Sequence, residues 1–148
     1  MLFEALATLC AGVFAGAAIY ITFVEQPARL ECGTELAATE FGPSYRRATL
    51  MQASLAAVGL VAALVAWVQD EALAVLVGGL LLGLVIPFTL IVILPTNRRL
   101  LDPGLDRNSA EAAALLARWG KLHAVRSIMS ALAFGLLVWH LAGQSQGR

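Results

Sequence analysis

Long apolar runs divide the chain into four segments of membrane-spanning length. They cover residues 5–24, 48–68, 72–94 and 122–142, and each run contains few polar side chains. A helix needs about 20 largely apolar residues to cross roughly 30 Å of hydrocarbon. The pattern therefore predicts an all-α membrane protein, a four-transmembrane-helix bundle formed as a single domain over residues 1–148.

The connectors between these runs predict how the helices are joined. Only residues 69–71 separate the second run from the third, which forces an antiparallel helical hairpin. The other two connectors are longer and lie together at the opposite end of the bundle. Gly42 and Pro43 suit the start of the second helix, because a proline in a first turn costs no helical hydrogen bond. Pro87 predicts a kink within the third helix.

The composition agrees with a lipid environment. Of the 148 residues 59% are hydrophobic and 14% are charged, and the mean hydropathy is +0.79. A chain of this size cannot bury so much apolar surface in a water-soluble core, so the lipid bilayer is its expected partner. The formal net charge is zero, which argues against a nucleic-acid partner.

We expect the first run to be retained as a helix rather than cleaved as a signal peptide, because it is preceded by Glu4 instead of basic residues.

The distribution of basic residues predicts an orientation. Lys and Arg side chains gather in the two long connectors and the helix ends beside them, whereas the opposite end carries only Arg148. The positive-inside rule then predicts a protein of a bacterial inner membrane, with the connectors in the cytoplasm and both termini outside. Arginines held in a functional pocket would produce the same distribution, so the arginine-rich connectors report either topology or a pocket.

Near the connector end, each predicted helix carries a polar stripe. At about 100° per residue, Trp119, His123 and Arg126 fall within one narrow arc of the fourth helix. Tyr45 and Gln52 share a face of the second helix. The stripes of the first and third helices contain Glu25, Arg29 and Asn97. Ionisable groups within a membrane usually face the bundle interior, so these stripes predict a polar pocket in the cytoplasmic half.

Each of these residues also has a purely structural interpretation. Glu25 and Arg29 are four residues apart in the favourable order for an interfacial ion pair. Arg98 is also typical of a lipid-headgroup anchor, and Trp119 of an interfacial aromatic belt. His123 alone is more typical of a hydrogen-bonded structural histidine than of a base.

The sequence predicts no metal site and no cofactor. His123 and His140 are 17 residues apart on one helix, which is about 25 Å at roughly 1.5 Å per residue, so they cannot share an ion. Cys10 and Cys32 form no CxxC motif. No phosphate-binding loop or Ser-His-Asp arrangement is recognisable.

Four segments together resemble a known family. They are residues 24–30 (VEQPARL), 45–52 (YRRATLMQ), 94–100 (LPTNRRL) and 119–126 (WGKLHAVR). The chain resembles the anthrone-oxygenase-like family of small four-helix membrane proteins over nearly its whole length. In fungal members, the named activity is the oxidation of polyketide anthrones to anthraquinones by molecular oxygen, without a metal or a flavin. Many bacterial members resemble these in motif only, so the resemblance implies the fold more securely than the substrate.

The resemblance suggests roles for the residues of the predicted pocket. An anthrone has an acidic methylene whose anion reacts directly with oxygen, so the protein needs a base and a group that stabilises negative charge. His123 is the candidate base, and Arg126, helped by Arg29 or Arg98, is the candidate stabilising group. Asn97, the third candidate catalytic residue, would hydrogen-bond substrate oxygens together with Gln52. Trp119 and Tyr45 would stack on the substrate rings, and Glu25 is a further candidate binding residue.

Two other classes of function stay open. The first is a non-catalytic membrane module that binds a small amphipathic molecule or another membrane protein. The second is a transporter, which is less attractive because the sequence shows no obvious internal repeat, although a homo-oligomer could supply one. Both the oxygenase and the binding module predict a small lipophilic molecule as the ligand.

Overall fold

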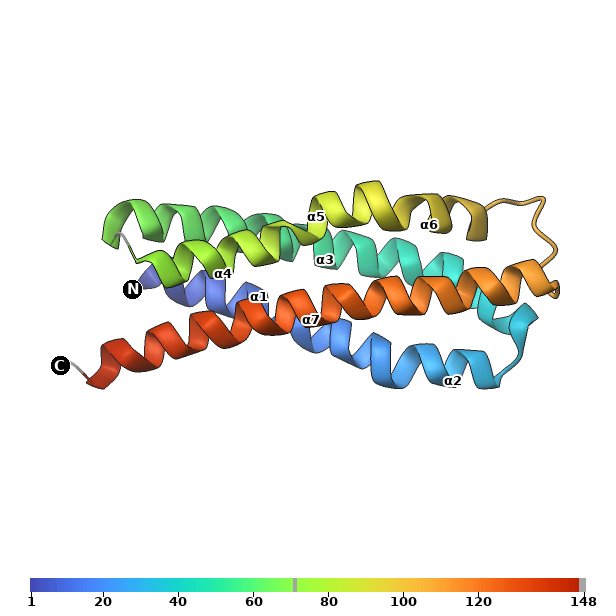
Figure 1. Ribbon diagram of the computed structural model, residues 1–148, viewed down its shortest axis with the longest axis horizontal. Coiled ribbons are helices and arrows are strands. Elements are labelled where there is room, and N and C mark those ends of the chain that lie inside the picture. The colour runs from blue at the N-terminus through green and yellow to red at the C-terminus, as the bar shows by residue number, and fades with distance from the viewer. Residues whose placement is uncertain (71, 147–148) are drawn as a thin grey trace.

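The computed structural model describes residues 1–70 and 72–146, and every regular element in these two ranges is a helix. Within this part of the chain, the helical segments long and apolar enough to cross a membrane are Leu2–Glu31, Thr34–Gln69, Leu73–Leu100 and Ala110–Gln144. They run side by side in an elongated bundle with both termini at one end (Figure 1). The predicted fold class is confirmed, and the protein is an integral membrane protein in contact with the lipid bilayer.

Two of the four segments are interrupted by π-helical turns. The first segment consists of α1 (Leu2–Tyr20), the π-turn η1 (Ile21–Glu25) and α2 (Gln26–Glu31). The third consists of α4 (Leu73–Gly83), α5 (Val85–Phe88), the π-turn η2 (Thr89–Ile93) and α6 (Leu94–Leu100). The second and fourth are single long helices, α3 (Thr34–Asp70) and α7 (Ala110–Gln146).

The second helix begins earlier than the sequence predicts. It starts at Thr34 rather than at Gly42 and Pro43, so that prediction is wrong. The chain reverses instead at Gly33, whose φ of +92° is a conformation that favours glycine. Pro43 lies inside α3 on an exposed face, where the carbonyl that loses its hydrogen bond to the proline stays accessible.

The predicted hairpin joins α3 to α4. One helix ends at Asp70, the other begins at Leu73, and the two pack against each other. Glu71 of the predicted connector lies outside the described residues. Glycines allow this close approach, because a Cβ on Gly79 would collide with Ala63 and a Cβ on Gly83 would lie 2.7 Å from the Leu60 side chain.

Prolines shift the connector half of the third segment away from α3. The segment breaks at Leu84, three residues before Pro87, which agrees with the predicted kink. A second proline, Pro95, follows the π-turn η2, as Pro27 follows η1. Proline has no N–H to donate the next α-helical hydrogen bond, which accounts for the irregular turn before each of them. In Figure 1, α5 and α6 leave the line of α4. As a result α3 packs along α4 but makes few contacts with α5 and α6.

The connector between α6 and α7 is fixed by one exposed arginine. Arg99 pairs with Glu111 at the start of α7, with Nε to Oε1 at 2.7 Å, and with Asp102 in the loop at 2.8 Å. The Asp102 carboxylate also accepts a hydrogen bond from the N–H of Gly104 at 2.8 Å. This backbone bond, together with Arg99, lowers the pKa of Asp102.

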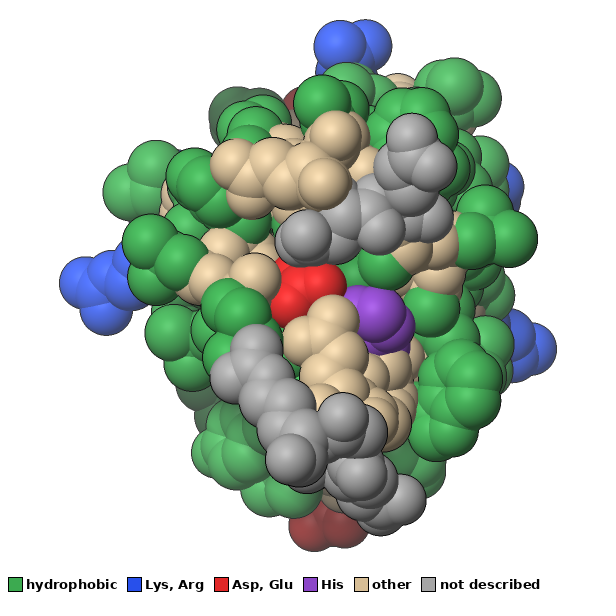
Figure 2. All heavy atoms as spheres, turned by 90° about the vertical axis from the view of Figure 1, so that its left-hand side faces the viewer, with side chains coloured by type: hydrophobic (Ala, Val, Ile, Leu, Met, Phe, Trp, Pro, Cys, Tyr) green, Lys and Arg blue, Asp and Glu red, His purple; other side chains and the backbone are tan. Residues whose placement is uncertain are grey.

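At the terminal end, a buried acidic side chain joins the first and last helices. Glu4 is 1% exposed, and its carboxylate lies 3.0 Å from Nε2 of His140 and 2.9 Å from the side-chain nitrogen of Gln144. Figure 2 shows an acidic side chain and a histidine side by side near the middle of this end of the bundle. These hydrogen bonds connect α1 to α7 at the end opposite the connectors.

Candidate functional site

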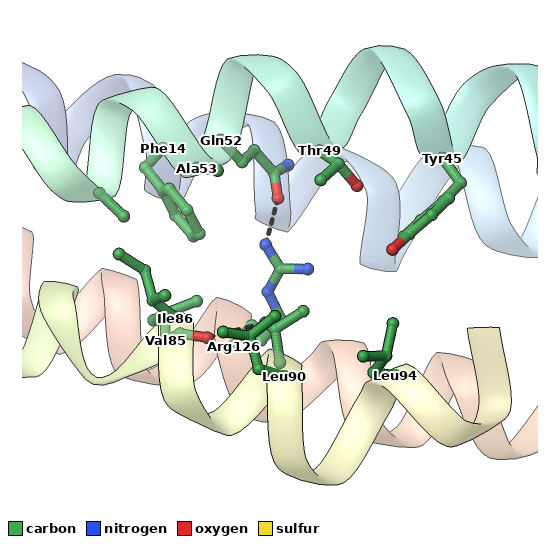
Figure 3. Close-up of a pocket in the computed structure, with 12 residues that line it drawn as sticks. Phe14, Tyr45, Thr49, Gln52, Ala53, Val85, Ile86, Leu90, Leu94 and Arg126 are labelled. Carbon is green, nitrogen blue, oxygen red and sulfur yellow. Dashed lines mark hydrogen bonds between the residues drawn. The ribbon is translucent and has the colours of Figure 1, made fainter. Parts of the chain in front are cut away.

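A cavity of about 100 Å³ opens where α3 and the α5–α6 half of the third segment separate. Its wall is largely apolar, with polar side chains from α3, η2 and α7 (Figure 3). The lining residues are Phe14, Tyr45, Thr49, Gln52, Ala53, Ala56, Val85, Ile86, Thr89, Leu90, Leu94 and Arg126. Thr49, Ala53 and Leu90 are exposed, so the cavity reaches the surface that faces lipid.

Arg126 projects into this cavity from α7. Its Nη2 donates a hydrogen bond to Oε1 of Gln52 at 2.6 Å, as the dashed line in Figure 3 shows. The guanidinium carbon lies 5.5 Å from the centre of the Phe14 ring, a cation–π contact. Among the described residues, Arg126 forms no ion pair with a carboxylate, and neither its buried Nε nor Nε2 of Gln52 has a hydrogen-bond partner.

A second, smaller cavity of about 20 Å³ adjoins the first. The two share Tyr45, Thr49, Gln52 and Arg126 in their walls. The smaller one is completed by Ile21, Arg29, Phe41, Ser44, Ala48, Trp119 and His123. Its volume is enough for about one water-sized group.

Aromatic packing fixes the imidazole of His123. The ring is 2% exposed and stacks on Trp119, with ring centres 4.8 Å apart. Phe41 meets Trp119 edge-on at 5.3 Å, and the guanidinium carbon of Arg29 lies 5.8 Å from the centre of the Trp119 ring. The predicted stripe of Trp119, His123 and Arg126 therefore lies along one wall that spans both cavities.

Hydroxyl groups lie on the other side of the imidazole. Oγ1 of Thr22, in the π-turn η1, is 3.1 Å from Nδ1 of His123 and 2.7 Å from Oγ of Ser127. Ser127 in turn donates to the backbone carbonyl of Ala18 at 3.0 Å. Thr22 is not among the predicted site residues, although its position three residues before Glu25 places it on the predicted polar stripe.

The charge of Arg29, unlike that of Arg126, is compensated. Its side chain pairs with Glu25, and its Nε lies 2.6 Å from Oε2 of Glu40, an ion pair whose angle falls outside hydrogen-bond geometry. Ser44 donates to the Glu25 carboxylate at 2.7 Å. Arg29 lines the smaller cavity, whereas Glu25 pairs with Arg29 and lines neither cavity.

Besides Glu25, two of the predicted site residues line neither cavity. Asn97 is 1% exposed and packs inside the bundle, and neither atom of its amide has a hydrogen-bond partner within the described residues. Arg98 is exposed. Neither side chain lines the two cavities, so their roles stay predictions.

The site has the groups for acid–base chemistry and for binding an anion. It combines a buried imidazole, a guanidinium without a carboxylate partner among the described residues, and an apolar cavity open toward lipid. The described residues contain no group of three or more His, Cys, Asp and Glu side chains that could hold a metal ion.

The fold and this site define a class of protein: a small helical membrane protein with a polar site beside a lipid-facing cavity. The chain belongs to the anthrone oxygenase family, whose model matches residues 41–136. The match includes Tyr45, Gln52, Trp119, His123 and Arg126. No curated protein and no solved structure gives a significant match.

Proposed function

We propose that the protein is a membrane-embedded oxygenase that acts on a lipophilic aromatic molecule with an acidic C–H group, without a cofactor. The observation that carries this proposal is the guanidinium of Arg126, which lines an apolar cavity and has no carboxylate partner among the described residues. A cation in an apolar environment is costly unless an anion neutralises it. A substrate that becomes an enolate or phenolate in the cavity supplies that anion.

The site residues would divide the reaction between them. His123 takes a proton from the acidic methylene, and Arg126 stabilises the resulting enolate. The carbanion adds molecular oxygen, and the hydroperoxide then loses water to leave a new carbonyl. One oxygen atom thus enters the product and the other leaves as water. Gln52 and Tyr45 lie where they could contact substrate oxygens or rings.

The size of the cavity limits how the substrate binds. A protein cavity of roughly 150 Å³ holds one benzene ring, and this cavity is about 100 Å³. A three-ring anthrone would therefore insert its reacting edge toward Arg126 and leave its remaining rings in the lipid-facing opening between α3 and η2. Exposed Leu90, at 58%, forms part of that opening.

The direct test is anthrone loss in air with purified protein in detergent. His123→Gln should lower turnover by about 10²- to 10⁴-fold, because the base is removed. Arg126→Gln should lower it by about 10²- to 10³-fold, because the anion loses its stabilising charge. Arg118→Gln is the matched control, because Arg118 is an exposed arginine of the same helix and lines neither cavity. Unchanged turnover in both site variants would refute the proposal.

The small cavity volume also favours a second candidate function, a non-catalytic module that binds an amphipathic anion. In that case the wild-type protein binds a fluorescent aromatic carboxylate, Arg126→Gln weakens this binding, and anthrone loss equals the protein-free rate. One measurement therefore distinguishes the two functions: the rate of anthrone loss with the wild-type protein.

We further propose that the connector end, which holds both cavities, faces the cytoplasm of a bacterial inner membrane. The arginines of this end support the orientation through the positive-inside rule. Arg29 is a weaker indicator than the others, because its charge is neutralised inside the bundle by Glu25 and Glu40.

A further inference from the structure

A chain of hydrogen-bond contacts links Nδ1 of His123 through two hydroxyl groups to a backbone carbonyl. Nδ1 of His123 contacts Oγ1 of Thr22 at 3.1 Å, Thr22 contacts Oγ of Ser127 at 2.7 Å, and Ser127 contacts the carbonyl oxygen of Ala18 at 3.0 Å. Ser127 also lies 3.3 Å from the carbonyl oxygen of His123. Each hydroxyl has a single proton to donate.

The carbonyl end of the chain fixes its direction. Both backbone carbonyls beside Ser127 can only accept, so the Ser127 hydroxyl donates to one of them. Ser127 must then accept the proton of Thr22 across their 2.7 Å contact. Since the proton of Thr22 is used there, Thr22 can only accept from His123, and Nδ1 of His123 must carry the proton.

The reverse direction makes fewer bonds. If Ser127 donated to Thr22 and Thr22 to Nδ1, the oxygen of Ser127 would face two carbonyl oxygens at 3.0 Å and 3.3 Å without a proton between them. A buried acceptor pair of this kind loses the bond and adds repulsion. Ser127 is 5% exposed, so water does not readily replace that bond.

We propose that Thr22 and Ser127 are positioning residues that hold His123 as the Nδ1-protonated tautomer, which leaves Nε2 unprotonated as the base. Trp119 holds the plane of the ring by stacking on it. Within the described residues, Nε2 accepts no hydrogen bond, and the imidazole lines the smaller cavity beside Arg126. The use of Nε2 as a base rests on the proposed function, whereas the tautomer does not.

The tautomer can be measured without any substrate. Full-length protein labelled with ¹⁵N-histidine in lipid nanodiscs gives separate signals for protonated and unprotonated ring nitrogens. The signals of His123 are those absent from His123→Gln. We expect the wild-type ring to be neutral, with the proton on Nδ1. Thr22→Val removes the acceptor and should shift His123 toward the Nε2-protonated form, whereas Thr22→Ser should keep the wild-type pattern.

A matched control separates this effect from a general loss of a buried hydroxyl. Thr8→Val removes a part-buried threonine hydroxyl that bonds a backbone carbonyl at 2.8 Å near the opposite end of the first segment, and it should leave the His123 signals unchanged. A wild-type ring protonated at Nε2, or at both nitrogens at neutral pH, would overturn the proposal. An unchanged tautomer in Thr22→Val would overturn the role of Thr22.

The catalytic consequence is tested separately. If the proposed function holds, Thr22→Val should lower kcat about tenfold or more, up to the roughly 10²- to 10⁴-fold of losing the base, and Thr22→Ser should restore it. The Nδ1 tautomer in a protein without anthrone turnover would refute the oxygenase but not the positioning. Normal turnover in Thr22→Val with an altered tautomer would refute the use of Nε2. Should Thr22→Val fail to fold, the wild-type and Thr22→Ser spectra still decide the tautomer.

Discussion

At the scale of single residues, the two arginines that line the cavities, buried Arg29 and half-buried Arg126, differ in what surrounds them. Arg29 meets two carboxylates, Glu25 and Glu40, whereas Arg126 meets the neutral amide of Gln52 and the ring of Phe14. A buried charge that is paired within the fold contributes to structure, and one that is not paired is available to a ligand. The two arginines should therefore respond in opposite ways to replacement by an apolar residue.

Replacement by methionine tests this contrast. Arg126→Met removes a charge without an ion-pair partner among the described residues, so thermal stability in detergent should be unchanged or higher while binding of an aromatic carboxylate is lost. Arg29→Met leaves two carboxylates unpaired. Because Glu25 and Glu40 are 26% and 50% exposed, the loss should be only about 1–2 kcal/mol of unfolding free energy. Equal destabilisation by both changes would contradict this interpretation.

Some of the site follows from helical periodicity, and some does not. Trp119, His123 and Arg126 lie on one continuous helix, so their spacing places them on one wall. Thr22 has helical spacing to Glu25, but this spacing does not show that its hydroxyl contacts His123, which lies on another helix. Ser127 is equally a small packing residue in the sequence, and only its distance to Thr22 shows a polar role.

At the scale of helices, run length and apolar content were enough to predict the fold, because a bilayer allows few alternatives to spanning helices. The residues at which the helices begin are harder to predict from the sequence. Gly33 and the pair of Gly42 and Pro43 are comparable turn signals in the sequence, and the bundle uses the first of them. The choice depends on packing of the early turns of α3, where Ala37, Ala38 and Phe41 are buried in the connector-end core.

Glycine packing at the hairpin gives a second prediction. Gly79→Ala places a methyl group against Ala63, so we expect it to lower the unfolding free energy by about 1–3 kcal/mol. Gly16→Ala is the matched control, since no atom lies within 4 Å of its Cβ position. It should be neutral or stabilising by up to about 1 kcal/mol, because alanine favours a helix. Unfolding in a detergent titration measures both, and equal effects would contradict the packing described.

At the scale of the whole molecule, the first and second membrane-spanning segments form a pair with the same architecture as the third and fourth. Each pair has a segment interrupted by a π-turn and a proline, followed by a helix of 37 residues. The long helices also share a spacing: Tyr45, Thr49 and Gln52 on α3 correspond to Trp119, His123 and Arg126 on α7. The sequence alone shows no obvious internal repeat, because the two halves match in spacing and architecture rather than in residue identity. At the matching positions, α3 supplies neutral groups to the site, and α7 supplies the proposed base and the cation of Arg126.

The two cysteines allow the proposed orientation to be checked. Cys32 is exposed at the connector end and Cys10 is buried. With the connectors in the cytoplasm, a membrane-impermeant maleimide should not label intact bacteria expressing the protein and should label Cys32 after permeabilisation. Cys32→Ser is the control and should abolish labelling. Labelling of Cys32 in intact cells would place the connectors outside.

The opening of the cavity toward lipid, through Thr49, Ala53 and Leu90, has a kinetic consequence. A substrate that enters sideways is presented at its concentration per lipid, not per volume of water. Added empty vesicles would then dilute the substrate in two dimensions and slow turnover, even though its total amount is unchanged. The membrane is thus both the solvent of the protein and the reservoir of substrate, and the substrate concentration in it sets the fraction of sites that are occupied.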